Sequence, residues 1–173
     1  MDSSEKRKLI LNTVSYCEKN GRFLQEKKFL QHGNVSVHRH SINVAILSLD
    51  IANKYNFRID CDSLVRGALL HDYFLYDWHT HEGFPCSHGF VHPFIALKNA
   101  ENDFVLSQCE KDIIVHHMFP LVPIPPCTLE GWIVCVADKI CASLELAYAI
   151  KMSLRNSVIF LCKKTLQLIK IIT

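Results

Sequence analysis

The sequence of 173 residues contains no run of about 18 or more uncharged apolar residues, the length that a transmembrane helix requires. Residues 1–7 are polar and charged, so they lack the apolar core of a secretory signal. The formal net charge is only +2, which is too small an excess to indicate binding to nucleic acid or to a membrane surface. We therefore expect a cytoplasmic protein with no membrane partner and no stable nucleic-acid partner.

The sequence also lacks cysteine pairs of the C-x-x-C type, although it contains eight cysteines. Zinc sites built from thiolates use such close pairs, and disulfide frameworks are typical of small secreted chains. Several of these cysteines lie within apolar helical segments. We therefore expect reduced, buried thiols and no thiolate metal site.

Alternating strand patterns of convincing length, internal repeats and low-complexity tracts are absent as well. Apolar residues recur instead at helical spacing, and 49% of the chain is hydrophobic, which suits one all-α domain with a sizeable core. The expected helices cover residues 6–18, 38–55, 64–72, 94–101, 106–117, 129–152 and 156–172, with a long loop over residues 73–92. The expected helix caps are Ser36, Asp62 or Ser63, Ser107 with Glu110 in a capping box, and Thr128.

Histidine is the abundant polar residue, with ten copies of which seven lie between His71 and His117. His71 and Asp72 end the apolar run of residues 64–70, and His40 and Asp138 lie on the apolar faces of their helices. A carboxylate on such a face is costly unless it is paired or binds a cation. Helices that each bring a ligand-type side chain inward are how bundles build metal sites.

One divalent metal would be held by His40, His71, Asp72 and Asp138. The second carboxylate oxygen of Asp72 would bridge to another metal, held by His92 and His117. His116 is the open alternative to His117, because neighbours in a helix point about 100° apart. This imidazole and carboxylate set suits one or two ions of Fe, Mn, Co, Zn or Mg.

The order His…His-Asp…Asp resembles the HD superfamily of metal-dependent phosphohydrolases. The resemblance is carried by HSINVA at residues 40–45, LLHD at residues 69–72 and VADK at residues 136–139, and the His92-Pro93 and His116-His117 pairs resemble the branch with a second metal. It covers residues 36–146 and implies a compact HD-domain helical bundle, a single domain over residues 1–173 with flanking terminal helices. Met118-Phe119-Pro120 stands where the HD-GYP branch has an acidic residue and Gly-Tyr-Pro, so cyclic-di-GMP hydrolysis is not expected.

The resemblance implies hydrolysis of a phosphate ester or anhydride by a metal-activated water, with a nucleotide or another small phosphorylated molecule as substrate. The predicted catalytic residues are Asp72, His88 and Lys139, of which the last two would offset charge on the phosphoryl oxygens. Arg66 would either contact phosphate or form an ion pair. Two alternatives are a diiron oxygenase similar to inositol oxygenase and a non-catalytic nucleotide sensor. The last helix would pack in the core or form a homodimer.

Overall fold

The computed structural model describes the fold of residues 1–79 and 88–172, with side chains up to residue 157. Helices dominate it, so the predicted all-α class is confirmed. The elements are α1 (Ser3–Asn20), the 3₁₀ helix η1 (Phe23–Lys28), β1 (Leu30–His32), β2 (Val35–Ser36), α2 (Val37–Lys54), α3 (Cys61–Leu70), α4 (His88–Asp103), α5 (Gln108–His116) and α6 (Leu129–Ile172).

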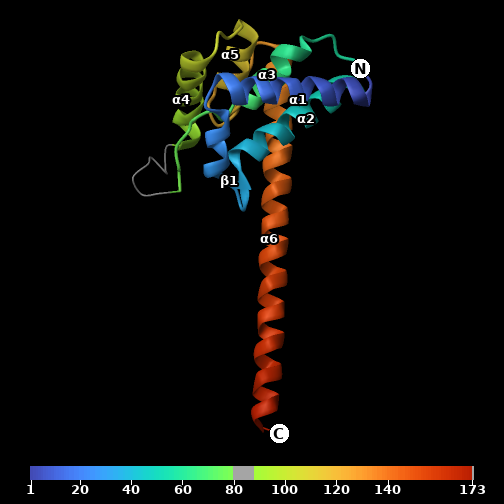
Figure 1. Ribbon diagram of the computed structural model, residues 1–173, viewed down its shortest axis with the longest axis vertical. Helices are drawn as coiled ribbons and strands as arrows, with labels where there is room; N and C mark the ends of the chain where they lie inside the picture. The colour runs from blue at the N-terminus through green and yellow to red at the C-terminus, as the bar shows by residue number, and fades with distance from the viewer. Residues whose placement is uncertain (80–87, 173) are drawn as a thin grey trace.

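Helices α1 to α5 form a compact head into which the first part of α6 is packed (Figure 1). Helix α3 lies at its centre and contacts α2, α5 and α1, while α6 packs against α2 and α5. At Gly67 the approach of α3 to α5 is so close that a Cβ atom would lie 2.5 Å from Cδ1 of Ile113. The buried cluster includes Val44, Leu64 and Val134. This core surrounds the end of α3, where the His71-Asp72 dipeptide lies.

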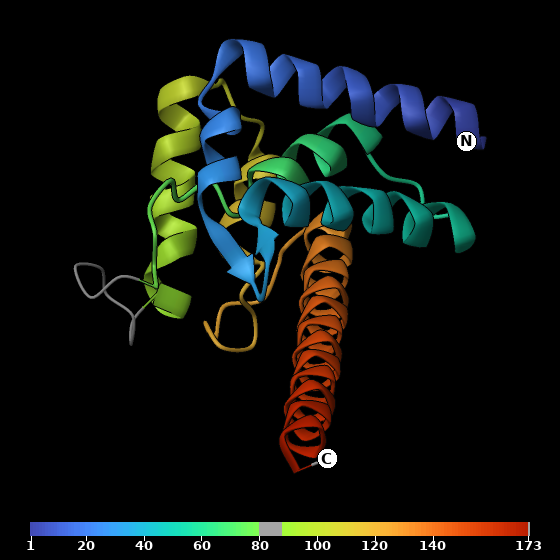
Figure 2. The same ribbon diagram turned by 60° about the horizontal axis from the view of Figure 1, so that its bottom comes forward.

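Helix α6 is a single element that leaves the head and continues as an isolated rod in both views (Figures 1 and 2). The prediction of two helices, over residues 129–152 and 156–172, is therefore wrong. No glycine or proline occurs over residues 132–172, so nothing in the backbone interrupts the helix at Asn156. Among the described side chains past residue 143, several large apolar ones are exposed rather than packed in the core: Leu144, Leu146, Tyr148, Ile150 and Leu154.

Three predicted caps are confirmed. The Ser36 hydroxyl accepts from the Arg39 amide, Ser107 forms a capping box with Glu110, and the Thr128 hydroxyl accepts from the Gly131 amide at 3.0 Å. The predicted cap of α3 is wrong. The helix begins at Cys61, and Asp60 caps it by accepting from the amides of Asp62 and Ser63 at 3.1 and 3.2 Å.

Two further elements differ from the expectation. Helix α4 begins at His88 and contains Pro93, so the helix predicted over residues 94–101 is longer and the loop predicted over residues 73–92 is shorter. Side-chain packing around His88 here outweighs the weak helix propensity of a segment with glycine and proline. The antiparallel β1–β2 hairpin was missed because strands of three and two residues show no alternation. Gly33 turns the hairpin at a positive φ of 61°.

The described part of the chain has no helix that combines the length and apolar character needed to cross a membrane. The described cysteines are unpaired, as predicted, and burial raises the pKa of the Cys17 thiol to about 12. The expectation of buried thiols is wrong for Cys127, which is exposed, and holds only in part for Cys61 and Cys109, which are half-buried. Cys86 and the side chain of Cys162 lie outside the described residues.

Candidate metal centre

The His71-Asp72 dipeptide lies directly after the last residue of α3, and both side chains are buried. The chain that follows is fixed from the side of α4. The Tyr73 hydroxyl donates to Oδ2 of Asp103 at 2.7 Å, and the Asn99 amide donates to the Tyr73 carbonyl at 3.0 Å. Since these contacts hold the backbone immediately after Asp72, its carboxylate has a defined orientation.

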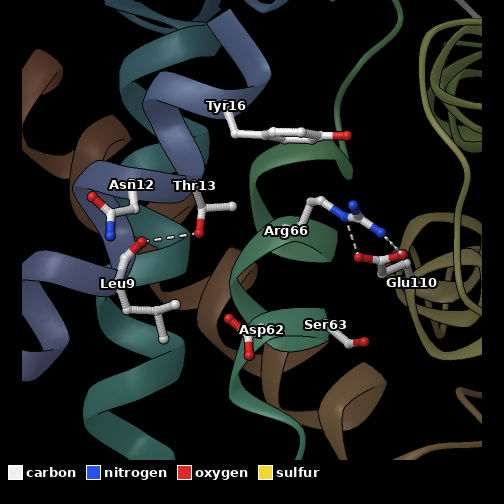
Figure 3. Close-up of a pocket in the computed structure, with 8 residues that line it drawn as sticks. All are labelled: Leu9, Asn12, Thr13, Tyr16, Asp62, Ser63, Arg66 and Glu110. Atoms are coloured by element: carbon white, nitrogen blue, oxygen red, sulfur yellow. Dashed lines mark hydrogen bonds and ion pairs between the residues drawn. The ribbon is translucent and has the colours of Figure 1, made fainter. Parts of the chain in front are cut away.

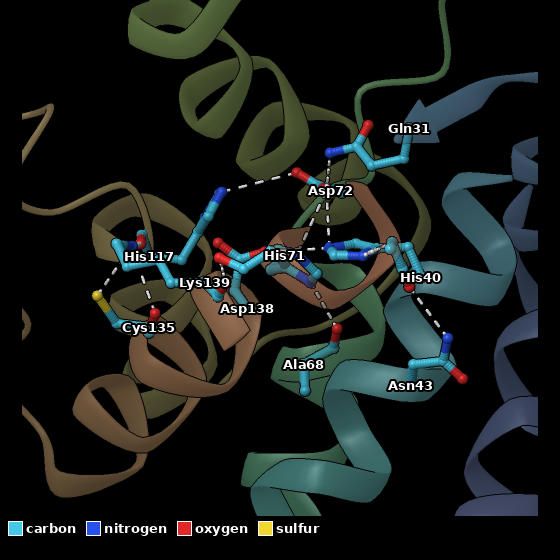
Figure 4. Close-up of polar contacts among 12 residues, drawn as sticks. Gln31, His40, Asn43, Ala68, His71, Asp72, His117, Cys135, Asp138 and Lys139 are labelled. Carbon is cyan, nitrogen blue, oxygen red and sulfur yellow. Dashed lines mark hydrogen bonds and ion pairs between the residues drawn. The ribbon is translucent and has the colours of Figure 1, made fainter. Parts of the chain in front are cut away.

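One group of ligand-type atoms, here called site A, consists of His40, His71, Asp138 and Oδ2 of Asp72. Nε2 of His40 lies 3.0 Å from Oδ1 of Asp138, and Nε2 of His71 lies 3.3 Å from Oδ2 of Asp72 and 3.7 Å from Oδ1 of Asp138. The side chains come from α2, from the end of α3 and from α6, and they converge on one point (Figure 4). All are buried, with the two imidazoles completely enclosed.

A second group, here called site B, consists of His92, His117 and Oδ1 of Asp72. This oxygen lies 3.2 Å from Nε2 of His92 and 3.6 Å from Nε2 of His117. The two Nε2 atoms lie 2.9 Å apart. The six predicted metal ligands thus form two adjacent groups, and the carboxylate of Asp72 directs one oxygen to each.

Three of the histidines have their tautomer set by the backbone. Each Nδ1 hydrogen-bonds a main-chain carbonyl, which can only accept, so this nitrogen carries a proton, and Nε2 is the nitrogen that offers a lone pair in the neutral, metal-binding form of the ring. The carbonyls are those of Ala68 at 2.7 Å from His71, His88 at 2.8 Å from His92 and Ile114 at 2.8 Å from His117. Nε2 of all three rings therefore faces the interior of the site. Against the effect of burial, the carboxylates of Asp72 and Asp138 raise the pKa of His71 above its ordinary value.

These residues fit the divalent metal that the sequence predicts. Nε2 of His71 and Oδ1 of Asp72 are buried without any hydrogen-bond partner. Such atoms cost free energy unless a donor or a cation satisfies them. Nε2 of His92 and Nε2 of His117 lie close enough together to bind one cation between them. Neutral imidazoles with carboxylates are the ligand set of divalent iron, manganese, cobalt and zinc.

The charges in site A are strongly coupled. Burial alone would lower the pKa of His40, but hydrogen bonds to Asp138 and Glu145 raise it to about 9. Burial likewise tends to raise the pKa of Asp138, yet hydrogen bonds from His40 and His71 hold it well below its usual range. An imidazolium therefore lies between two carboxylates, and these negative surroundings also favour a metal cation.

Asp72 and His117 are in the protonation states that bind metal. Burial opposes ionisation of Asp72, but its contacts with His71 and His92 keep its pKa well below the ordinary value. Burial, together with the neighbouring His71 and His92, lowers the pKa of His117 to about 3. At neutral pH, Asp72 is therefore an anion and His117 a neutral imidazole, as metal binding requires.

His116, the open alternative to His117, does not face either site. Its Nδ1 donates to Oδ1 of Asp112 at 2.7 Å. The same carboxylate accepts from the amides of Cys127 and Thr128, both at the start of α6, at 2.9 and 2.8 Å. Asp112 thus joins α5 to the start of α6, and His116 belongs to that contact.

The two other predicted catalytic residues border site B. The Lys139 amine donates to the His117 carbonyl at 2.7 Å (Figure 4). The His88 ring stacks on the His92 ring, with centroids 4.5 Å apart, and its Nδ1 lies 2.8 Å from the Tyr76 hydroxyl. Burial lowers the pKa of His88 to about 4, so the ring is neutral at physiological pH. That His88 and Lys139 contact a substrate stays a prediction.

Arg66 lies in a different place, a surface groove of about 420 Å³ between α1, α3 and α5 (Figure 3). Its guanidinium donates through two nitrogens to the carboxylate of Glu110, with Nη2 at 2.7 Å from Oε2. Of the two roles left open for Arg66, the structure shows the ion pair.

Sequence reasoning missed three side chains near the ligands. The Gln31 amide, on β1, donates to Oδ2 of Asp72. Glu145 hydrogen-bonds His40, and its position seven residues after Asp138, about two helical turns, was a usable signal. Glu26, on η1, is fully buried, and neither of its carboxylate oxygens has a hydrogen-bond partner. Neither Gln31 nor Glu26 has a spacing relative to a ligand that could have indicated its place.

The HD domain family matches residues 37–143, more than half of the chain. The chain therefore belongs to the HD domain family, which supports a metal-dependent hydrolase-type function, and the predicted resemblance is confirmed. No match was found among curated proteins or among solved structures.

Proposed function

We propose that this protein is a metal-dependent phosphohydrolase that cleaves a phosphate ester or anhydride bond in a nucleotide or another small phosphorylated molecule. The observation that carries the proposal is the orientation of Asp72. Its Oδ2 lies 3.3 Å from Nε2 of His71 in site A, and its Oδ1 lies 3.2 Å from Nε2 of His92 in site B. Bridging carboxylates of this kind are typical of centres that hold two metal ions about 3.5–4 Å apart.

Each site has its own ligands in this proposal. Site A would hold a cation through His40, His71, Asp138 and Oδ2 of Asp72, and site B would hold one through His92, His117 and Oδ1 of Asp72. Iron, manganese, cobalt, zinc and magnesium are the candidate ions. Divalent cations, when bound, lower the pKa of a coordinated water and offset negative charge on phosphoryl oxygens.

The protein contributes orientation and charge around these ions. Main-chain carbonyls hold Nδ1 of His71, His92 and His117, so Nε2 of each ring is directed into the site before it is loaded. We assign Lys139 and His88 to contacts with phosphoryl oxygens, because the Lys139 amine lies at the main-chain carbonyl of His117 and the His88 ring stacks on the His92 ring. Lys139 supplies a positive charge, and His88, being neutral, supplies a hydrogen bond.

The test is phosphate release by protein loaded with Mn²⁺, Co²⁺, Mg²⁺ or Fe²⁺, with nucleoside mono-, di- and triphosphates and dinucleoside polyphosphates as substrates. We expect turnover with at least one combination of metal ion and substrate. Asp72→Ala should lower the rate of phosphate release by about 100-fold or more. Asp62→Ala is the matched control, since this exposed carboxylate lies at the opposite end of α3. Oxygen uptake by the ferrous protein without phosphate release, or tight nucleotide binding without turnover, would contradict the proposal.

A further inference from the structure

His40 differs from the other three histidine ligands in how its Nδ1 is held. The other three bond main-chain carbonyls, whereas Nδ1 of His40 lies 2.9 Å from Oε2 of Glu145, a side chain on α6. A main-chain carbonyl stays in place as long as its helix is folded. The orientation of His40 depends instead on one carboxylate.

Glu145 is itself firmly held. Its side chain is only 10% exposed, and its other oxygen, Oε1, accepts from the Asn43 amide at 3.1 Å. Asn43 lies three residues after His40, on the same side of α2. Figure 4 shows His40 and Asn43 on this helix, with Asp138 opposite on α6. Both oxygens of Glu145 are thus used, one on the ligand and one on its neighbour.

His40 consequently lies between two carboxylates of the same helix. Nε2 is 3.0 Å from Oδ1 of Asp138, and Nδ1 is 2.9 Å from Oε2 of Glu145. The separation of seven positions between these acids corresponds to about two turns, which puts both on one face of α6. The match to the HD domain family ends at residue 143, so Glu145 belongs to the continuation of α6 beyond the matched segment.

We propose that Glu145 is a positioning residue for site A, which holds the proton of His40 on Nδ1 and directs the Nε2 lone pair toward the metal. The inference rests on the proposed metal centre. A carboxylate in this place fixes the ring orientation and makes the imidazole a stronger ligand, and losing such a partner typically lowers metal affinity by about 10–100-fold. Glu145 does not contact site B, where each histidine is held by a main-chain carbonyl. Its loss should therefore affect only site A.

The alternative is that Glu145 only stabilises the packing of α6 against α2, through its hydrogen bonds to His40 and Asn43. The two roles give different results in metal titrations. If Glu145 only stabilises helix packing, its loss lowers the stability of the metal-free protein and leaves the metal affinity of the folded protein unchanged. A positioning residue lowers the affinity of one site even when the protein is fully folded.

The experiment is calorimetric titration of the metal-free chain with Mn²⁺, for wild type, Glu145→Ala, Glu145→Gln and the surface control Glu101→Ala. A His117→Ala background removes a ligand of site B and isolates site A. We expect Glu145→Ala to weaken site A by about 10–100-fold and to leave site B unchanged. Glu145→Gln should lose less, because its amide oxygen still accepts the Nδ1 proton. Circular dichroism shows whether each variant is folded. If Glu145→Ala does not fold, the isosteric Glu145→Gln replaces it as the test variant.

Wild-type affinity at both sites in folded Glu145→Ala and Glu145→Gln would overturn the inference and leave the proposed function intact. Equal weakening of both sites would also overturn it, because the effect would not be specific to His40. Failure of the wild type to bind Mn²⁺ at all would instead refute the metal centre itself. The Co²⁺-loaded protein provides a second readout, since a displaced His40 changes the visible absorption bands of the ion in site A.

Discussion

Nε2 of His92 and Nε2 of His117 face each other at 2.9 Å, although each ring already donates its Nδ1 proton to a main-chain carbonyl. In the neutral form that metal binding requires, the two rings direct their Nε2 lone pairs to the same buried place. A cation there would accept both lone pairs and would also satisfy Oδ1 of Asp72, which has no hydrogen-bond partner. These atoms therefore support the cation proposed for site B.

The adjacent residues His116 and His117 give a matched pair of variants. We expect His117→Ala to reduce the metal content from two ions to one per chain, because it removes a ligand of site B. His116→Ala should keep both ions and lose about 1.5–3 kcal/mol of unfolding free energy, the typical value of a hydrogen bond to a charged group such as Asp112. Elemental analysis after dialysis and urea denaturation measure the two effects. Equal metal contents in the two variants would refute the assignment of His117.

The contact between Asp103 and Tyr73 fixes the chain after the ligands, and it predicts a pH dependence. Burial tends to raise the pKa of Asp103, but hydrogen bonds from Arg22 and Tyr73 lower it below the ordinary value. A carboxyl group whose pKa is lowered by folding stabilises the protein above its unfolded pKa of about 4 and loses this contribution at lower pH. Asp103→Asn should therefore cost about 2 kcal/mol at pH 7 and progressively less as the pH falls below about 4. A cost that is the same at pH 7 and pH 3 would contradict this account.

Glu26 predicts a pH dependence of stability that is opposite in sign to that of Asp103. Burial, and after it the nearby Asp72, raises the pKa of this unpartnered carboxyl well above its ordinary value. Folding then requires proton uptake, so the stability of the wild type decreases as pH rises through the unfolded pKa of about 4.3 toward the raised value. In chelator-treated protein, Glu26→Gln should match the wild type near pH 4 and exceed its unfolding free energy at pH 8, by about 1–3 kcal/mol. The idea fails if the difference between the two proteins does not change with pH.

Gly67 tests the packing of α3 on α5. A Cβ at this position would lie 2.5 Å from Cδ1 and 3.1 Å from Cβ of Ile113, so Gly67→Ala forces α3 and α5 apart. We expect a loss of about 1–3 kcal/mol, even though alanine favours the helix itself. Urea denaturation of Gly67→Ala, with Asp62→Ala on the exposed side of the same helix as the control, measures this loss of unfolding free energy. A gain in stability would mean that the two helices do not approach as closely as described.

Sequence reasoning singled out His40 and Asp138 because each lies on the apolar face of a helix, where an ionisable side chain is anomalous, and the structure brings the two side chains together. The bridging role of Asp72 stays a prediction, and the structure directs its two oxygens to His71 and to His92. Single-residue caps such as Ser36 were also predicted, because capping depends on the adjacent amides. The parts that failed depend on distant contacts. The hairpin that brings Gln31 to Asp72 is too short for a pattern, and the start of α4 at His88 is decided by packing around its ring.

The central claim is that the two oxygens of Asp72 serve two metal ions, and the most direct test is the number of Mn²⁺ ions bound per chain by Asp72→Ala. The wild type should bind two ions, and His117→Ala should bind one. Because Asp72 belongs to both sites, Asp72→Ala should weaken both by about 10-fold or more, so that neither ion survives dialysis. Retention of one tightly bound ion by Asp72→Ala, with only the other lost, would contradict the bridging role.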